Sequence, residues 1–214
     1  FYHQGFILAC ETQIMTRFSG RTAIVTGSAS GIGRGIAQKL GAEGANVVVA
    51  DLAPEPNNGG TPTHQVIQEE GGEAIFLETD VTDEESIQDT VYRTAKKYGK
   101  IDILVNNAGV HHSASVTEET KAGWNQVIGV NLNGAFMFSK HVIQHMLDED
   151  VQGDIVNIGS IAGLVGYGES AAYCASKGAI VEITREMAID YGGEGINVNA
   201  VDPGVIKTAM TKEM

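Results

Sequence analysis

Short apolar runs alternate with longer stretches of helical periodicity along the chain. The runs consist mainly of valine, isoleucine, leucine and alanine without an alternating polar face, which is typical of strands buried on both sides. Strands that alternate with helices in this way predict an α/β fold with a doubly wound parallel sheet. The expected strands are 22–26, 46–50, 74–77, 103–105, 154–158 and 196–201.

Polar residues mark where some of the intervening helices begin. The sequence Thr82-Asp83-Glu84-Glu85 has the form of a capping box, so we expect a helix from there to about Lys97. The Pro- and Gly-rich stretch 54–60 is expected to be a surface loop, and no linker divides the chain, so the elements belong to one domain. Further helices are expected around 36–41 and at 63–70, 117–147 (with a break near Gly129) and 172–191.

The first strand runs directly into the glycine-rich segment Gly27-Ser28-Ala29-Ser30-Gly31-Ile32-Gly33, and a helical pattern follows. Glycines let the backbone turn tightly and approach a pyrophosphate, whose negative charge is stabilised at a helix N-terminus. A tight turn without a ligand is the alternative interpretation. Strand, turn and helix nevertheless follow each other in the order that a dinucleotide site requires.

Asp51 stands at the end of the second expected strand. In a dinucleotide fold, an acid at this position accepts hydrogen bonds from the adenosine ribose, and it would repel the 2′-phosphate of NADP. Neither Ser30 nor Leu52 supplies a positive charge that would offset this repulsion. We therefore expect NAD as the cofactor, although Asp51 taken alone could be a solvated carboxylate at a strand end.

Tyr173 and Lys177 are one helical turn apart, so the phenol and the ammonium can face the same bound molecule. A phenol titrates near ~10 and is a poor base at neutral pH, whereas a neighbouring ammonium favours the phenolate. Ser160, which follows the fifth strand, is a candidate donor to a substrate oxygen. Tyrosine and lysine share this spacing by chance on many helices, and it is the nucleotide motif that favours a general acid–base pair here.

From about Thr16 to its last residue, the chain resembles the short-chain dehydrogenase/reductase family in several ordered motifs. Thr26-Gly27-Ser28-Ala29-Ser30-Gly31-Ile32-Gly33 is similar to the family's Thr-Gly-x-x-x-Gly-x-Gly cofactor turn, and Asn106-Asn107-Ala108-Gly109 matches its Asn-Asn-Ala-Gly signature. Asp80-Val81 resembles the pair that contacts adenine, and Pro203-Gly204 with the residues after it resembles the segment that wraps the nicotinamide. The resemblance implies a Rossmann fold.

The resemblance also implies a role for each catalytic residue. Tyr173 would take the hydroxyl proton from an alcohol or supply a proton to a carbonyl, while Lys177 would hold the nicotinamide ribose and lower the pKa of the phenol. Ser160 would orient the substrate oxygen, although it could instead satisfy an amide at a strand end. Asn131 would hold a water that passes protons from Lys177 to solvent, although it could merely cap or kink its helix.

The remaining site residues follow from the same resemblance. The implied cofactor-binding set is Gly27, Ser30, Gly31, Ile32, Gly33, Asp51, Asp80, Val81, Asn107, Ala108, Gly109, Tyr173, Lys177, Pro203, Gly204, Ile206 and Thr208. By their position relative to the catalytic residues, the candidates for lining the substrate pocket are Val110, His111, Ala162, Val165, Tyr167 and Gly204.

Composition limits the partners and the compartment. The 214 residues are 43% hydrophobic, which is enough for a sizeable core, and the net charge of −13 argues against nucleic acid and anionic membranes as partners. We therefore expect a cytoplasmic enzyme with a small alcohol or carbonyl substrate, and the family resemblance implies a homo-oligomer. An acidic surface is typical both of halophilic proteins and of ordinary acidic enzymes, and composition does not decide between them.

Cysteines and histidines indicate neither disulfides nor a metal. Cys10 and Cys174 are too few for a disulfide framework, and the six histidines show no metal-ligand spacing, so we expect no metal. His111 and His112 follow the Asn-Asn-Ala-Gly segment, close to where the substrate is expected. A pair of solvated loop residues is the favoured interpretation.

Both ends of the chain depart from the family pattern. Residues 1–14 have no counterpart in the family and are expected to be a disordered, non-native leader ahead of a domain at 15–214. Family members continue after the segment 203–208 with a helical substrate lid, another helix and a last strand. The domain is expected to lack these elements, which leaves open whether this form of the chain is active.

The leading hypothesis is an NAD-dependent oxidoreductase. It would transfer a hydride between NAD(H) and a secondary alcohol, sugar or 3-hydroxyacyl substrate and its carbonyl form. An NADP-dependent 3-oxoacyl reductase is the alternative enzyme, against which Asp51 argues. A non-catalytic dinucleotide-binding module is the alternative from another class, and such a protein would be expected to have lost Tyr173 or Lys177.

Overall fold

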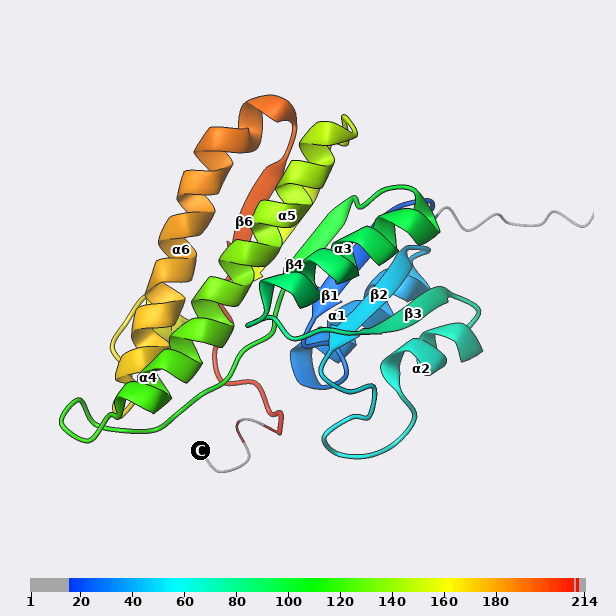
Figure 1. Ribbon diagram of the computed structural model, residues 1–214. Helices are drawn as coiled ribbons and strands as arrows, with labels where there is room; N and C mark the ends of the chain where they lie inside the picture. Colours follow the sequence, from blue (N-terminus) through cyan, green and yellow to red (C-terminus); the bar gives the residue numbers. More distant parts are fainter. Residues whose placement is uncertain (1–15, 210, 212–214) are drawn as a thin grey trace, which may run out of the picture.

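The computed structural model describes residues 16–209 and Thr211, so the leader expected at 1–14 lies outside the described residues. Within this part, parallel strands form one sheet in the order β3-β2-β1-β4-β5-β6 (Figure 1). The chain starts at β1, winds outward to β3, and then returns to β4 on the other side of β1, which makes the sheet doubly wound as expected. The strands are β1 (Thr22–Thr26), β2 (Asn46–Asp51), β3 (Glu73–Glu78), β4 (Ile103–Asn106), β5 (Asp154–Ile158) and β6 (Asn197–Val201).

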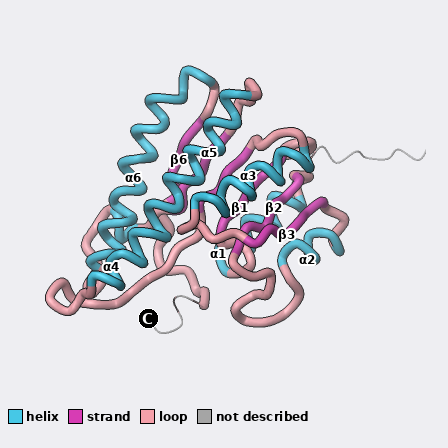
Figure 2. Tube along the Cα trace, viewed as in Figure 1, coloured by secondary structure: helices cyan, strands magenta, loops and turns pink. Residues whose placement is uncertain are grey.

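Helices connect the strands and cover the two faces of the sheet in two groups (Figure 2). Apolar side chains of α1 and α2 pack on one face, and those of α3, α5 and α6 pack on the other, each with a separate buried cluster. The helices are α1 (Gly31–Ala42), α2 (Thr63–Glu69), α3 (Glu84–Tyr98), α4 (Lys121–Ile128), α5 (Ala135–Asp148) and α6 (Ala171–Tyr191). Short 3-10 turns follow β5 (Ile161–Gly163) and α6 (Gly192–Glu194).

Two helix starts differ from those expected. Asp83, and not Thr82, caps α3, because its carboxylate accepts a hydrogen bond from Glu85 N at 3.1 Å while the Thr82 hydroxyl donates to Asp80 at 2.7 Å. The helix expected from residue 117 begins at Lys121, since Thr120 Oγ1 accepts from Gly123 N at 2.9 Å and fixes the N-terminus there.

The break expected near Gly129 is a π-helical turn, Gly129–Gly134, which joins α4 directly to α5. Its extra residue buries the Asn131 side chain, which is 1% exposed. A Cβ on Gly134 would lie 2.9 Å from the carbonyl oxygen of Val81, so glycine is needed where this turn approaches the chain after β3. The π turn therefore brings a predicted catalytic residue beside the carboxyl edge of the sheet.

None of the helices in the described part of the chain is long and apolar enough to cross a membrane.

Candidate active site

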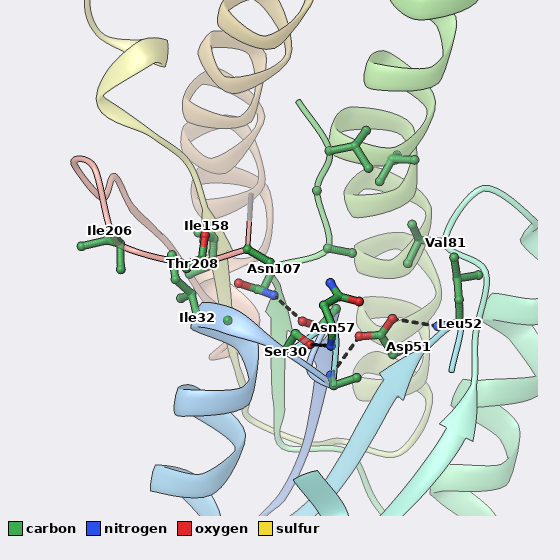
Figure 3. Close-up of a pocket in the computed structure, with 18 of the residues that line it drawn as sticks. Ser30, Ile32, Asp51, Leu52, Asn57, Val81, Asn107, Ile158, Ile206 and Thr208 are labelled. Carbon is green, nitrogen blue, oxygen red and sulfur yellow. Dashed lines mark hydrogen bonds between the residues drawn. The ribbon is translucent and has the colours of Figure 1, made fainter. Parts of the chain in front are cut away.

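A single cavity of about 480 Å³ runs along the carboxyl ends of the strands, from the glycine turn after β1 to the segment after β6 (Figure 3). This is the edge at which a doubly wound sheet binds its ligand. Two of the predicted site residues, Gly33 and Asn131, do not line the cavity. The predicted residues that do line it are Gly27, Ser30, Gly31, Ile32, Asp51, Asp80, Val81, Asn107, Ala108, Gly109, Ser160, Tyr173, Lys177, Pro203, Gly204, Ile206 and Thr208.

The glycine turn is packed too tightly for side chains. Gly27 has a φ of +63°, and a Cβ there would lie 2.8 Å from Ala108 Cα. Gly33 is buried, and a Cβ on it would lie 2.4 Å from both Gly27 O and Asn107 Nδ2. Gly33, in the first turn of α1, therefore lets this helix pack against Gly27 and Asn107, and Gly27 lets the turn pack against Ala108.

Thr26, the last residue of β1, ties this turn to the segment after β4. Its hydroxyl donates to Val105 O at 3.3 Å and accepts from the backbone amides of Asn107 and Ala108, both at 3.0 Å. Asn107 Nδ2 donates in return to Thr26 O and Gly27 O at 2.9 and 3.0 Å. Two motifs that are far apart in the sequence thus form one hydrogen-bonded floor of the cavity.

At the other end of the cavity, Asp51 lies at the carboxyl end of β2. Its carboxylate accepts hydrogen bonds from Ala29 N at 2.9 Å and Leu52 N at 2.8 Å, which fixes its orientation (Figure 3). Each carboxylate oxygen keeps a lone pair for a further donor, such as a ribose hydroxyl. Among the described residues that line the cavity, the acids are Asp51, Glu55 and Asp80, and Lys177 is the only lysine or arginine.

Sequence reasoning missed the loop after β2, which also lines this end of the cavity. Asn57 N donates to Ser30 Oγ at 2.7 Å and so joins the loop to the glycine turn (Figure 3). The position of the loop directly after Asp51 was the signal that could have identified it. The lining residues that were not expected are Ala29, Ala50, Leu52, Ala53, Glu55, Asn57, Thr79, Val130, Ile158, Gly159, Ala209 and Thr211.

Lys177 lies on α6 with its ammonium buried beside the end of β5. Nζ donates to Ile158 O at 2.7 Å, and the residue is 5% exposed. Burial lowers the pKa of Lys177 to about 8, against a smaller opposite effect of the Asp202 carboxylate. The ammonium is 5.8 Å from the centre of the Tyr173 ring, so both side chains face the same part of the cavity, as their spacing predicts.

The lowered phenol pKa that we expected from Lys177 is not found. Burial raises the pKa of Tyr173 above its ordinary value, and only the hydrogen bond with Ser160 opposes this effect. Lys177 points instead to the Ile158 carbonyl. Desolvation of the phenolate therefore dominates, and the phenol is protonated at neutral pH.

Ser160 lies at the end of β5 and starts the 3-10 turn that follows. Its Oγ accepts from Ala162 N at 3.1 Å, and its own backbone amide donates to Asp202 Oδ1 at 3.0 Å. Ser160 does satisfy a turn amide, which was the structural alternative. It also lines the cavity with Tyr173, and because the turn uses only a lone pair, its hydroxyl proton is available to the Tyr173 phenol.

Asn131 sits behind the cavity wall. Its Oδ1 accepts from Val110 N at 2.8 Å, and its Nδ2 donates to Val110 O at 3.0 Å and to Ser176 Oγ at 3.1 Å. Both protons of the side-chain amide are used in these hydrogen bonds. The predicted water at Asn131, which stays a prediction, would therefore have to donate to one of the residue's oxygens. Asn131 also has a structural role, because its hydrogen bonds to Val110 and Ser176 hold the chain after β4 against α6.

The candidates for the substrate side fall into two groups. Val110 and Gly204 line the cavity, whereas His111, Ala162, Val165 and Tyr167 do not. Val165 and Tyr167 are exposed, and Ala162 is buried. His111 and His112 lie in a loop, as expected, but neither is fully solvated. Both are half-buried and hydrogen-bonded, His111 to Ser170 at 2.9 Å and His112 to Glu119 at 3.2 Å.

In the described part of the chain, no three histidine, cysteine or acidic side chains gather in a way that could hold a metal ion. Tyr173, Ser160 and Lys177 are the side chains of the cavity that were predicted to transfer or orient a proton. A glycine turn, a strand-end acid, a tyrosine and a lysine in one cavity are the arrangement typical of an α/β oxidoreductase that uses a nicotinamide dinucleotide.

Comparison with known proteins identifies the family. Residues 21–214 match the model of the short chain dehydrogenases, and the chain belongs to that family. It is 39% identical to a meso-2,3-butanediol dehydrogenase of Serratia marcescens, over 91% of this chain and 75% of the relative. It is 39% identical to a cis-4-hydroxycyclohexanecarboxylate dehydrogenase of Sinomonas cyclohexanicum, over 90% and 76%, and 37% identical to glucose 1-dehydrogenase 2 of Bacillus subtilis, over 89% and 73%.

The fold agrees with the same family. A crystal structure assigned to a short-chain alcohol dehydrogenase of Sinorhizobium meliloti 1021 superimposes with a TM-score of 0.85 at 36% identity. The superposition covers 92% of this chain and 77% of that one. The doubly wound sheet and the oxidoreductase class expected from the motifs are thereby confirmed.

Proposed function

We propose that the chain is an NAD-dependent oxidoreductase that interconverts a secondary alcohol and its carbonyl form. The observation that carries this proposal is one continuous cavity with Asp51 at one end and Tyr173, Ser160 and Lys177 at the other. The glycine turn lines the cavity between the two ends and leads into the N-terminus of α1, where the charge of a pyrophosphate would be stabilised. When bound there, NAD supplies the hydride acceptor.

The preference for NAD over NADP is supported by the charges around the adenosine end. Asp51 and Glu55 both line it, and a 2′-phosphate placed beside them would meet two carboxylates. Arg34 on α1 is directed elsewhere, since its guanidinium donates to Thr61 O at 2.9 Å and to Thr63 Oγ1 at 3.2 Å. An NADP-dependent 3-oxoacyl reductase is therefore disfavoured.

The roles of the reacting side chains follow from their surroundings. The Tyr173 phenol is protonated at neutral pH and can donate that proton to a carbonyl oxygen, while Ser160 donates a second hydrogen bond to the same atom. In the direction of alcohol oxidation, Tyr173 must first lose its proton, so a positive charge on Lys177 assists that direction. The pKa of Lys177, at about 8, lets the ammonium carry this charge at neutral pH.

The substrate class is supported by the chemistry shared among the relatives. The names of the three similar dehydrogenases describe a diol, a hydroxylated ring and a sugar, each of which carries a hydroxyl on carbon. We propose a secondary alcohol or sugar for this chain, with a 3-hydroxyacyl compound as the other member of the class. Cytoplasmic location and a homo-oligomeric state are further proposals, supported by the family alone.

Turnover of a secondary alcohol with NAD, followed as NADH absorbance, tests this function. Tyr173→Phe removes the proton carrier but keeps the ring, so we expect at least a hundredfold loss of kcat with NADH binding nearly unchanged. Tyr167→Phe is the matched control, because Tyr167 is exposed and does not line the cavity. Comparable turnover in the Tyr173→Phe variant would refute the proton-transfer role.

A further inference from the structure

Asp202 follows the last strand, β6, and its side chain reaches the end of the neighbouring strand, β5. Its Oδ1 accepts a hydrogen bond from the backbone amide of Ser160 at 3.0 Å. The two flanking amides donate to backbone carbonyls, Gly159 N to Val201 O at 2.8 Å and Ile161 N to Pro203 O at 3.1 Å. A side chain, and not the backbone, thus fixes the amide of the residue that was predicted to orient the substrate oxygen.

Gly159 leaves the room that this carboxylate occupies. A Cβ on Gly159 would overlap Asp202 Oδ1. Gly159 is flanked by Ile158, whose carbonyl oxygen accepts from Lys177 Nζ at 2.7 Å, and by Ser160, which lines the cavity. Consecutive residues at the end of β5 therefore contact Lys177, make room for Asp202 and carry the hydroxyl of Ser160.

Asp202 also acts on Lys177 through its charge. Burial lowers the pKa of the ammonium to about 8, and the Asp202 carboxylate opposes this effect. Tyr173, on the same helix, faces the ammonium too, but burial raises the pKa of its phenol, which is uncharged at neutral pH. The chain after β4 and the π turn bring uncharged groups, since a Cβ on Gly109 would lie 3.8 Å from Lys177 Nζ and 3.4 Å from Asn131 Oδ1. Without the carboxylate, Lys177 would lose its proton at a lower pH.

We propose that Asp202 is a positioning residue of this site, which fixes the backbone of Ser160 and keeps Lys177 charged while an alcohol is oxidised. Asp202 does not line the cavity, so it acts through the two residues that do. This inference rests on the proposed function, because the charge on Lys177 matters to the reaction only when Tyr173 gives up its proton.

Titration of the lysine side chains by carbon-13 NMR tests this role without turnover, and Lys177→Met identifies the Lys177 signal. Asp202→Asn keeps an oxygen for the Ser160 amide but removes the charge, so we expect the midpoint of Lys177 to fall from about 8 by about one pH unit. Asp190→Asn removes the same charge from the exposed end of the same helix and should leave the midpoint unchanged. An unchanged midpoint in Asp202→Asn would overturn the inference.

The pH dependence of kcat/KM for oxidation of a secondary alcohol with NAD separates this role from a merely structural one. Loss of the Lys177 proton lowers the rate, so Asp202→Asn should lose about fivefold at pH 8 and little at pH 6. A loss of equal size at both pH values would contradict the proposal. If the unaltered chain oxidises no secondary alcohol, the proposed function fails, while the NMR midpoint still decides the role of Asp202.

Gly159→Ala tests the same role without altering a charge. Its methyl group would displace the Asp202 carboxylate, so the midpoint of Lys177 should fall as it does in Asp202→Asn. Asp202→Ala removes the acceptor as well, and we expect its Ser160 amide to exchange hydrogen about tenfold faster than in Asp202→Asn. Equal exchange in these two variants would contradict the part assigned to Asp202 at Ser160.

Discussion

At the residue scale, the site contains a buried ammonium, that of Lys177, whose burial lowers the stability of the folded protein. Lys177 is 5% exposed and has one hydrogen bond from Nζ to a backbone carbonyl, at 2.7 Å. Its depressed pKa means that the folded protein holds this charge less favourably than the unfolded chain does. A charged side chain whose burial destabilises the fold is expected at a functional position.

Replacing this lysine should therefore stabilise the free protein. A pKa lowered from 10.5 to about 8 corresponds to about 3 kcal/mol, and the lost hydrogen bond to Ile158 returns about 1 kcal/mol, so Lys177→Met should be more stable by about 2 kcal/mol at pH 7. Below pH 8 both states hold the proton and the cost is fully present. It fades as the pH rises toward 10.5, where the unfolded chain also loses the proton.

Urea unfolding at pH 7 and pH 10 measures this effect. The advantage of Lys177→Met should shrink markedly between the two pH values. Lys140→Met is the control, because Lys140 is half-exposed and pairs with Glu84 on the surface, and it should change stability by less than about 0.5 kcal/mol at both. A Lys177→Met variant that is less stable than the unaltered chain at pH 7 would contradict this account.

At the element scale, strands were easier to predict than helix ends. Valine- and isoleucine-rich runs between glycine and polar segments mark buried parallel strands without further information, and β1 and β5 agree with expectation to the residue. The starts of α3 and α4 depended on which of several side chains reaches a backbone amide, Asp83 or Thr82 in one case and Thr120 in the other. Such a choice is set by local geometry that a motif does not contain.

The site divides in a similar way. Residues within motifs, such as Gly27 and Tyr173, could be placed from the sequence because their spacing is tied to one turn or one helix. The loop with Asn57 and the contacts of Asn131 could not, since both depend on segments that meet only in the folded chain. The predicted lowering of the Tyr173 pKa was wrong for the same reason. How deeply the phenol is buried depends on the fold and not on the spacing between Tyr173 and Lys177.

The link between β1 and β4 gives a prediction at this scale. Thr26→Val keeps the shape of the side chain but leaves the amides of Asn107 and Ala108 without their acceptor, so we expect a loss of about 2 kcal/mol in stability and about tenfold weaker NADH binding.

Thr22→Val, at the opposite end of the same strand, is the matched control. The Thr22 hydroxyl accepts one weak hydrogen bond, from Asn46 at 3.4 Å, and lies away from the cavity. This variant should bind NADH as the unaltered chain does. Unchanged NADH binding in Thr26→Val, measured by fluorescence, would show that the hydrogen-bonded floor of the cavity does not shape the cofactor site.

At the scale of the whole molecule, the proposed function depends on the carboxyl edge of the sheet, where segments after all six strands meet the π turn and α6 around one cavity. The chain has a net charge of −13, and the proposed adenosine end of the cavity is acidic as well. Asp51 and Glu55 line this end, and none of the described lining residues there is basic. The proposed preference for a cofactor with no charge on its 2′-oxygen rests on this arrangement.

The most direct test is a fluorescence titration of the chain with NADH and, separately, with NADPH. We expect NADH to bind at least tenfold more tightly, and Asp51→Asn to reduce that difference by weakening NADH and relieving the repulsion of NADPH. Such a result would establish that the cavity is a dinucleotide site with Asp51 as its selector. Binding of NADPH as tight as that of NADH, or of neither, would contradict the proposed NAD-dependent function.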